Sequence, residues 1–430
     1  MEWTNKAVVA LCAAGMWMAV QAMAETVASG GDPAAATDAW TKELCGTVEE
    51  GARLLAENHL TPADGEAKAA LLEALIRASE PSVVFLDEEE LAARSQRLSQ
   101  REWDTGLTLV AMADGLPKVA AVQTNSPAAA AGILPGELIE KLGGHELSSG
   151  TGLKAVREML SEGEGAALEI GVRAADAKSR VVSVERVRRG DTSLIDVEDL
   201  PAGMGYMRAA GIFTGAGAEI VAALDKWQTA GAFGAILDLR GAGGTAEEEV
   251  PVVAARFAPE GDALYTMSDR QGKEILSVKA APAPVAPMSL MVLVDEETTG
   301  AAELLAAVLG GGVKGAMLIG RETAGDPMIR EPRKLSTGRY ALLATRQLKT
   351  ADGATYSGAG GVKPDVVITA SALDETVYEP DAPVLRKGKT MSDEEKEDKA
   401  LRDRTRNDTY LRRATDVLLG LKALGYDRKP

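Results

Sequence analysis

The sequence is poor in the residues that several common chemistries require. Its 430 residues include only two cysteines and two histidines, and aromatic residues make up 4% of the chain. Removal of an N-terminal leader would leave Cys45 as the only cysteine, which excludes an intrachain disulfide in the mature chain. With so few aromatic side chains, we expect a core built mainly from aliphatic residues. We expect neither a metal ion nor a cofactor.

Positive charge is also scarce. Lysine and arginine total 47 against 64 aspartates and glutamates, which gives a formal net charge of −17. This balance argues against nucleic acid and against anionic lipid surfaces as partners. It also keeps an exported protein soluble, which is the simpler interpretation.

Only the N-terminus carries a long apolar run. Residues 1–24 are typical of a secretory signal, because Lys6 precedes the apolar run Ala7–Val20 and small residues follow at Ala22-Met23-Ala24. We therefore expect cleavage before Glu25 and export to the periplasm or the cell envelope. The alternative is a retained N-terminal anchor.

The most informative stretch is Met291–Ala306. Its first part, Met291–Val294, predicts a buried strand, and the strong helix formers from Ala301 onward predict a helix. Three acids, two threonines and Gly300 lie between them. A strand that enters a helix through a short polar turn places this turn at the carboxyl edge of an α/β sheet, where active sites form. The first N–H groups of the helix can stabilise an oxyanion.

This stretch resembles the carboxyl-terminal processing peptidases, also called tail-specific proteases. That family carries Thr/Ser-Ala-Ser-Ala-Ala/Ser-Glu at this place, with the middle serine as its nucleophile. This chain has Thr298-Thr299-Gly300-Ala301-Ala302-Glu303 in the same frame. The resemblance therefore implies a serine-type peptidase fold in which the nucleophile position is Gly300, a residue that cannot attack.

A second motif of the family supplies a lysine as general base. The family pattern is Gly-x-x-Thr-x-Gly-Lys-Gly, and this chain keeps Gly320, Thr323 and Gly325 but has Asp326 at the lysine position. The glutamine that follows four residues later in the family is Arg330 here. A carboxylate is a poor base at neutral pH unless it is desolvated. Both members of the Ser–Lys dyad are thus replaced.

A third motif concerns the oxyanion hole. The family has Ile-Leu-Asp-Leu-Arg-x-Asn-x-Gly-Gly, and this chain keeps Asp238, Arg240, Gly243 and Gly244 in a shorter turn without the asparagine. By resemblance, an amide of Gly243 or Gly244 lines the hole together with the amide of Ala301. A phosphate loop is disfavoured because no Gly-Lys-Ser/Thr follows. We interpret the aspartate and arginine as an ion pair that orients the turn.

The region before this core resembles a PDZ domain. The segment Ser126–Ile139 follows the pattern Ser-Pro-Ala-x-x-Ala-Gly-x-x-x-Gly-Asp-x-Ile, with Glu137 in place of the aspartate. The resemblance implies that a loop binds the C-terminal carboxylate of a peptide while the peptide adds a strand to the sheet edge. The implied loop consists of Gly106, Leu107, Thr108 and Leu109. A PDZ fold kept as a rigid spacer is the alternative.

We therefore expect an α/β multidomain chain. Its expected parts are a signal peptide (1–24), an N-terminal helical region (25–100), a PDZ-like β-rich domain (101–190), a core like that of the tail-specific proteases (191–370), and a charged linker with a C-terminal helix (371–430).

Three interpretations of function remain open. The first is a non-catalytic homologue, a pseudoenzyme that binds peptide or protein C-termini. The second is an active hydrolase with a relocated nucleophile, Thr299 or Thr298; the core has no histidine, so a histidine-assisted triad within the chain is excluded. The third is a scaffold protein of the cell envelope. The sequence does not fix the bound peptide or the oligomeric state.

Overall fold

The computed structural model describes residues 41–42, 45–46, 48–50, 53, 65–81, 83–98, 103–112, 116–123, 126–148, 150–161, 166–174, 178–188, 192–284, 288–358, 360–369 and 391–425. The expected signal peptide lies outside these ranges, as does much of the expected linker. Within them, no helix is both long enough and apolar enough to cross a membrane.

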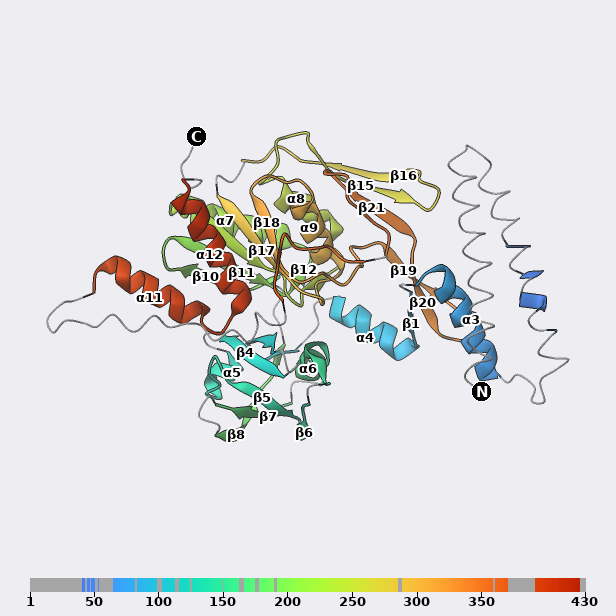
Figure 1. The fold of residues 1–430 in the computed structure, drawn as a ribbon, viewed down its shortest axis with the longest axis horizontal. Coiled ribbons are helices and arrows are strands. Elements are labelled where there is room, and N and C mark those ends of the chain that lie inside the picture. Colours follow the sequence, from blue (N-terminus) through green and yellow to red (C-terminus); the bar gives the residue numbers. More distant parts are fainter. Residues whose placement is uncertain are drawn as a thin grey trace.

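A six-stranded sheet forms the centre of the core domain (Figure 1). Its strands run parallel from β11 to β23, and β10 pairs antiparallel with β11 at one edge. In spatial order they are β10 (Leu194–Leu200), β11 (Met204–Ala209), β13 (Gly234–Asp238), β17 (Ser289–Val294), β18 (Ala316–Gly320) and β23 (Val366–Val367).

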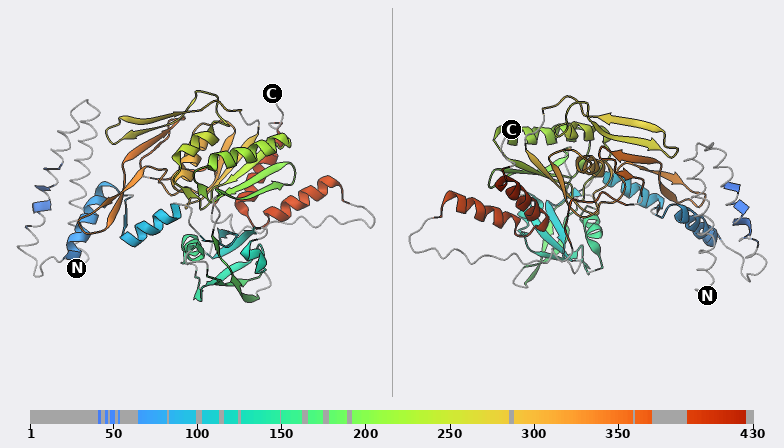
Figure 2. Two further views of the ribbon diagram at one scale, coloured as in Figure 1. Left: turned by 180° about the vertical axis from the view of Figure 1, so that it is seen from behind. Right: turned by 45° about the horizontal axis from the view of Figure 1, so that its top comes forward.

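Helices cover both faces of this sheet, which explains why its inner strands are apolar throughout. Side chains alternate between the faces, so Leu237 joins the cluster under α7, α8 and α9, while Ile236 packs with Leu411 and Leu418 of α12. Figure 2 shows α7 from the side opposite the C-terminal helices. The helices are α7 (Ala216–Thr229), η1 (Glu247–Glu249), α8 (Val250–Ala254), α9 (Gly300–Gly310), α11 (Asp393–Thr405) and α12 (Thr409–Ala423).

The PDZ-like domain lies against one edge of the core (Figure 1). Its sheet has the order β3-β4-β5-β7-β8, with β6 paired to β5. Val110 and Ala120 join the cluster of the core that contains Leu200 and Met204, so the two domains share buried apolar surface. The elements are β3 (Leu107–Ala111), β4 (Pro117–Val122), α5 (Pro127–Ala130), β5 (Leu138–Leu142), β6 (His145–Glu146), α6 (Gly152–Ser161), β7 (Leu168–Arg173) and β8 (Ser179–Val184).

Smaller sheets surround the core. The first has the order β1-β20-β19, the second β16-β15-β21-β22, and two pairs are β12-β14 and β2-β9. Helix α4 lies between the PDZ-like domain and the core (Figure 1). Bounds are α3 (Gly65–Ser79), β1 (Val84–Leu86), α4 (Glu88–Leu98), β2 (Trp103–Asp104), β9 (Val187–Arg188), β12 (Gly211–Ile212), β14 (Gly243–Gly244), β15 (Ala263–Asp269), β16 (Glu274–Lys279), β19 (Arg330–Lys334), β20 (Tyr340–Ala344), β21 (Arg346–Thr350) and β22 (Thr355–Tyr356).

One segment differs from the sequence-based expectation. We expected a charged linker before the terminal helix, but Asp393–Thr405 forms helix α11. Ser392 and Glu395 form a capping box at its start, and Lys399 pairs with Asp403 one turn further on. Because both features depend on residues three or four positions apart, a charged run that looks solvated can still be helical.

A buried charge cluster joins the C-terminal helix to the core. Arg240 pairs with Asp238 at 2.5 Å and with Asp408 at 2.8 Å, and all three side chains are almost inaccessible to water. Burial raises the pKa of Asp238, but the Arg240 guanidinium outweighs this and holds the pKa at about 2. Asp408 also accepts the N–H of Leu411 and so caps α12. The expected ion pair of the turn therefore extends to α12.

We predict that Asp408→Ala destabilises the chain by about 3–5 kcal/mol, because it leaves the buried Arg240 with only one partner and removes a helix cap. Denaturant unfolding measures this loss. Asp403→Ala serves as the control, since Asp403 is exposed, and it should have a much smaller effect. Equal effects of the two changes would contradict a structural role for the cluster.

Candidate active site

The turn between β17 and α9 is fixed by Asp295. Its carboxylate accepts the N–H of Gly241 at 2.8 Å and that of Glu297 at 3.2 Å, and it pairs with Arg157 of α6 at 3.0 Å. These contacts bind the turn to the neighbouring turn after β13 and to the PDZ-like domain. The carboxyl edge of the sheet thus brings together the two segments that the sequence motifs single out.

Gly300 is the first residue of α9 and is buried. Its φ is +60°, a conformation in which a side chain is strained. A Cβ at this position would lie 2.5 Å from the carbonyl oxygen of Gly244 and 3.2 Å from Cδ2 of Leu98. The place of a nucleophilic side chain is therefore filled by a backbone carbonyl and by the end of helix α4.

Asp326 lies beside Gly300, as the two motifs require. The N–H of Gly300 donates to the backbone carbonyl of Asp326 at 3.0 Å. The Asp326 side chain is buried and pairs with Arg94 of α4 at 2.5 Å, and it also accepts the N–H of Arg330 at 3.1 Å. Where the family places a lysine, this chain has a carboxylate neutralised by an arginine from another element.

Glu303 holds the Asp326 loop against α9. Its fully buried carboxylate accepts the N–H groups of Gly325 and Asp326, each at 2.7 Å, and the hydroxyl of Thr323. Burial raises the pKa of Glu303 to about 7, against the three donors that lower it. Glu303 is the last residue of the motif around Gly300, but no function was predicted for it from the sequence.

The two threonines at the turn have different environments. The hydroxyl of Thr298 donates to the carbonyl of Leu239 at 2.8 Å and accepts the N–H of Asp295 at 3.1 Å, and the residue is inaccessible to water. These contacts give Thr298 a structural position. The hydroxyl of Thr299 has no hydrogen-bond partner among the described residues, although it is buried.

The oxyanion-hole candidates lie around Gly300. Ala301 belongs to the first turn of α9, whose N–H groups have no intrahelical partner. The N–H of Gly243 donates to the carbonyl of Ala210 at 3.4 Å, within the pairing of β12 with β14. Gly244 directs its carbonyl, a hydrogen-bond acceptor, toward Gly300. Of the three candidates, Ala301 has the geometry that best suits an oxyanion.

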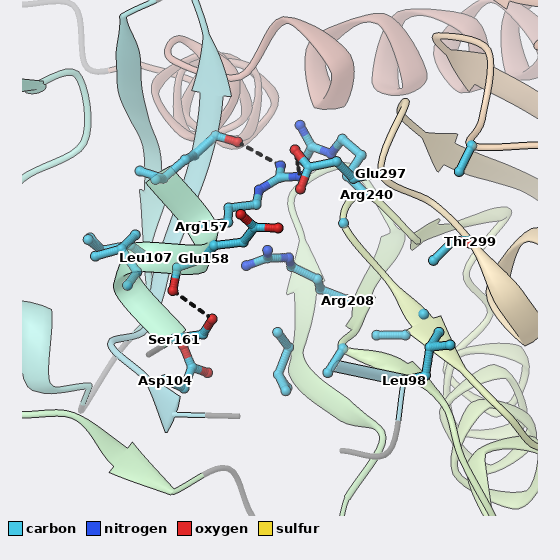
Figure 3. Close-up of a pocket in the computed structure, with 18 of the residues that line it drawn as sticks. Leu98, Asp104, Leu107, Arg157, Glu158, Ser161, Arg208, Arg240, Glu297 and Thr299 are labelled. Carbon is cyan, nitrogen blue, oxygen red and sulfur yellow. Dashed lines mark hydrogen bonds and ion pairs between the residues drawn. The ribbon is translucent and has the colours of Figure 1, made fainter. Parts of the chain in front are cut away.

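A cavity of about 240 Å³ connects the PDZ-like domain to this turn (Figure 3). On one side it is lined by Leu107 and Leu109 of β3 and by Leu160 of α6. On the other side it reaches Gly243 and Thr299. The structure thus places part of the expected peptide-binding segment and part of the expected catalytic turn on opposite walls of one space.

Four arginines of the cavity were not anticipated from the sequence as a group. Arg94, Arg157, Arg208 and Arg240 come from α4, α6, β11 and the turn after β13. Arg157 pairs with Asp295 and with Glu297, and its NH2 group donates to the carbonyl of Leu109 at 3.4 Å. A cation beside Asp326 could have been expected from the sequence, because a buried aspartate at the lysine position requires a positive charge nearby.

Residues 203–368 match the model of peptidase family S41, and residues 118–174 match that of the PDZ domain. In these two parts the chain is similar to the carboxyl-terminal processing peptidases. The S41 match spans the segments around Gly300 and Asp326, so both replacements lie inside the family domain.

Two curated relatives show the extent of this similarity. The carboxy-terminal processing protease CtpA of Bacillus subtilis is 26% identical over 293 residues, which cover 67% of this chain and 60% of that protein. The chloroplastic C-terminal processing peptidase of Tetradesmus obliquus is 27% identical over 312 residues, which cover 68% of this chain and 66% of that protein. The chain therefore matches somewhat less than two thirds of the length of these relatives.

The chain is also similar to a solved structure. The photosystem II D1 C-terminal processing protease matches with a TM-score of 0.46 and 21% identity, covering 84% of this chain and 94% of that one.

We predict that the stability difference between the native chain and Glu303→Gln decreases as the pH rises from 5 to 8. The folded-state pKa of Glu303 is about 7, above the value of 4.5 for an unperturbed glutamate. Stabilisation by the protonated form is complete below pH 4.5 and is lost as the pH rises through 7, a change of up to about 3 kcal/mol. Unfolding in denaturant at several pH values measures the difference. A difference that grows with pH would contradict this assignment.

Proposed function

We propose that this chain is an S41-family homologue that binds peptides and does not cleave them by Ser–Lys chemistry. The observation that carries the proposal is the packing at position 300. A backbone carbonyl and a leucine fill the space of the nucleophile, and the residue at the lysine position is paired with Arg94. Hydrolysis by a dyad requires an attacking hydroxyl and a nearby base, and neither is supplied here.

Peptide binding is supported by the PDZ-like domain and by the cavity beside it. Strand β3 forms one end of its sheet and, among the described strands, pairs with β4 alone, so its other edge offers a place for an added strand. The apolar side chains Leu107, Leu109 and Leu160 line the cavity along this strand. Such a groove suits a peptide with an apolar C-terminal residue.

A hydrolase with Thr299 as nucleophile is the second candidate function. The unpartnered hydroxyl of Thr299, on the wall of the cavity, is the observation that favours it. The carboxylate of Asp326 is the base that this mechanism would use, but it is paired with Arg94. Without a base in contact, the threonine hydroxyl is a weak nucleophile, so we rank this function second.

We further propose that the protein is exported and acts in the periplasm or the cell envelope. The proposal rests on residues 1–24, whose composition is that of a secretory signal. A scaffold function in the same compartment is compatible with the peptide-binding proposal, since a bound C-terminus can tether a partner.

We predict that the purified chain shows no turnover of unfolded or C-terminally tagged protein substrates. Binding and oxyanion stabilisation without an activated nucleophile leave a rate far below that of a working enzyme. Cleavage followed by mass spectrometry measures this, with Thr299→Ala as the companion variant. Robust cleavage by the native chain that Thr299→Ala abolishes would instead establish the threonine mechanism.

We also predict that the chain binds peptides with a free apolar C-terminus more tightly than their C-terminal amides. A free carboxylate carries a charge that the amide lacks, and charged hydrogen bonds are the stronger ones. Fluorescence anisotropy with a labelled decapeptide ending in valine, as the acid and as the amide, measures the two affinities. Equal affinities would favour the rigid-spacer interpretation of the PDZ-like domain.

A further inference from the structure

We propose that Arg208, on strand β11 of the core, binds the C-terminal carboxylate of the peptide. This inference rests on the proposed peptide-binding function and assigns its anion site. The sequence placed carboxylate recognition in the backbone of Gly106–Leu109. The structure favours a side chain from the neighbouring domain instead.

The expected carboxylate-binding loop already has a carboxylate partner within the chain. Gly106 opens this loop with a φ of +81°, and its N–H donates to the carboxylate of Asp104 at 2.9 Å. One amide of the loop is therefore already bound to a carboxylate of the chain itself. An incoming carboxylate would compete for this amide and would approach the like charge of Asp104.

Arg208 is the cation that we expect to bind the peptide carboxylate. Arg208 is half-buried, lines the cavity, and forms no ion pair with any residue that the structure describes. Its NH1 group donates to the hydroxyl of Thr108 at 2.8 Å, and its Nε is buried with no hydrogen-bond partner among the described residues. A guanidinium presents donors in a planar fork that suits a carboxylate. Arg208 therefore has hydrogen-bond donors available for a ligand where the PDZ-like domain meets the core.

The other three arginines of the cavity already form ion pairs with carboxylates of the chain. Arg94 is neutralised by Asp326, Arg240 by Asp238 and Asp408, and Arg157 by Asp295 and Glu297. Arg208 differs from them in forming no ion pair within the described part of the chain, although its charge acts to lower the pKa of Asp196, its cross-strand neighbour on β10, and that of Asp238. Binding an anion at Arg208 therefore breaks no ion pair.

Position also favours Arg208. Its contact with Thr108 places the guanidinium two residues along β3 from Gly106, close to where a peptide added to this strand would end. Figure 3 shows the side chain extending from the core into the middle of the cavity, toward Glu158 and Ser161 of α6.

The test uses the full chain and the same valine-terminated decapeptide, as the acid and as the amide. Arg208→Gln should weaken binding of the acid about tenfold or more, to the affinity of the amide, and should leave the amide unchanged. Arg208→Lys keeps the charge and should retain part of the preference. Arg333→Gln, an exposed arginine on β19, is the matched control and should bind both peptides like the native chain.

The outcomes separate this inference from the proposed function. A preference for the acid that survives in Arg208→Gln overturns the inference and returns the carboxylate to the loop, while peptide binding stands. Absence of binding by the native chain overturns both. If Arg208→Gln does not fold, modification of the native chain by phenylglyoxal decides: the acid but not the amide should protect Arg208, and equal protection overturns the inference.

Discussion

The candidate site depends on the buried carboxylate of Glu303. It projects from α9 and binds two amides and a hydroxyl of the loop that carries Asp326. The N–H of Gly300, also on α9, adds a hydrogen bond to the carbonyl of Asp326. Without Glu303, the buried N–H groups of Gly325 and Asp326 would lose their partners. This contact therefore has a structural role that does not depend on the chemistry of the site.

The replacements at positions 300 and 326 fit one another and their surroundings. Glycine allows the carbonyl of Gly244 to approach to a distance that no side chain tolerates, and aspartate gives Arg94 a partner. A serine at 300 would have to displace this carbonyl and Leu98. A lysine at 326 would oppose the Arg94 cation inside a buried space, which is costly. Both replaced residues and the three groups around them, which are the Gly244 carbonyl and the side chains of Leu98 and Arg94, would thus have to change together to rebuild a dyad.

Local patterns made much of the fold predictable. The apolar run before Asp295 and the helix formers after Gly300 predicted β17 and α9, because both are buried on all sides. The capped segment at Ser126 predicted α5, with the expected hydroxyl cap. The arginines of the cavity could not be predicted in this way, since Arg94 and Asp326 are 232 residues apart. The hydrogen bond from the N–H of Gly106 to the carboxylate of Asp104 could likewise not be predicted, because it depends on the backbone conformation.

Residues of both domains line the cavity, so the arrangement of the domains affects what the cavity can bind. A PDZ-like domain on its own would offer a peptide only its strand edge and loop, whereas here β11 contributes a wall and an arginine. The contact between Arg208 and Thr108, together with the ion pairs of Arg157, fixes how the two domains meet. Any ligand in the cavity touches both domains at once, so its affinity depends on their relative position as well as on the groove. The residues of such a composite site can therefore act in recognition whether or not a bound peptide is cleaved.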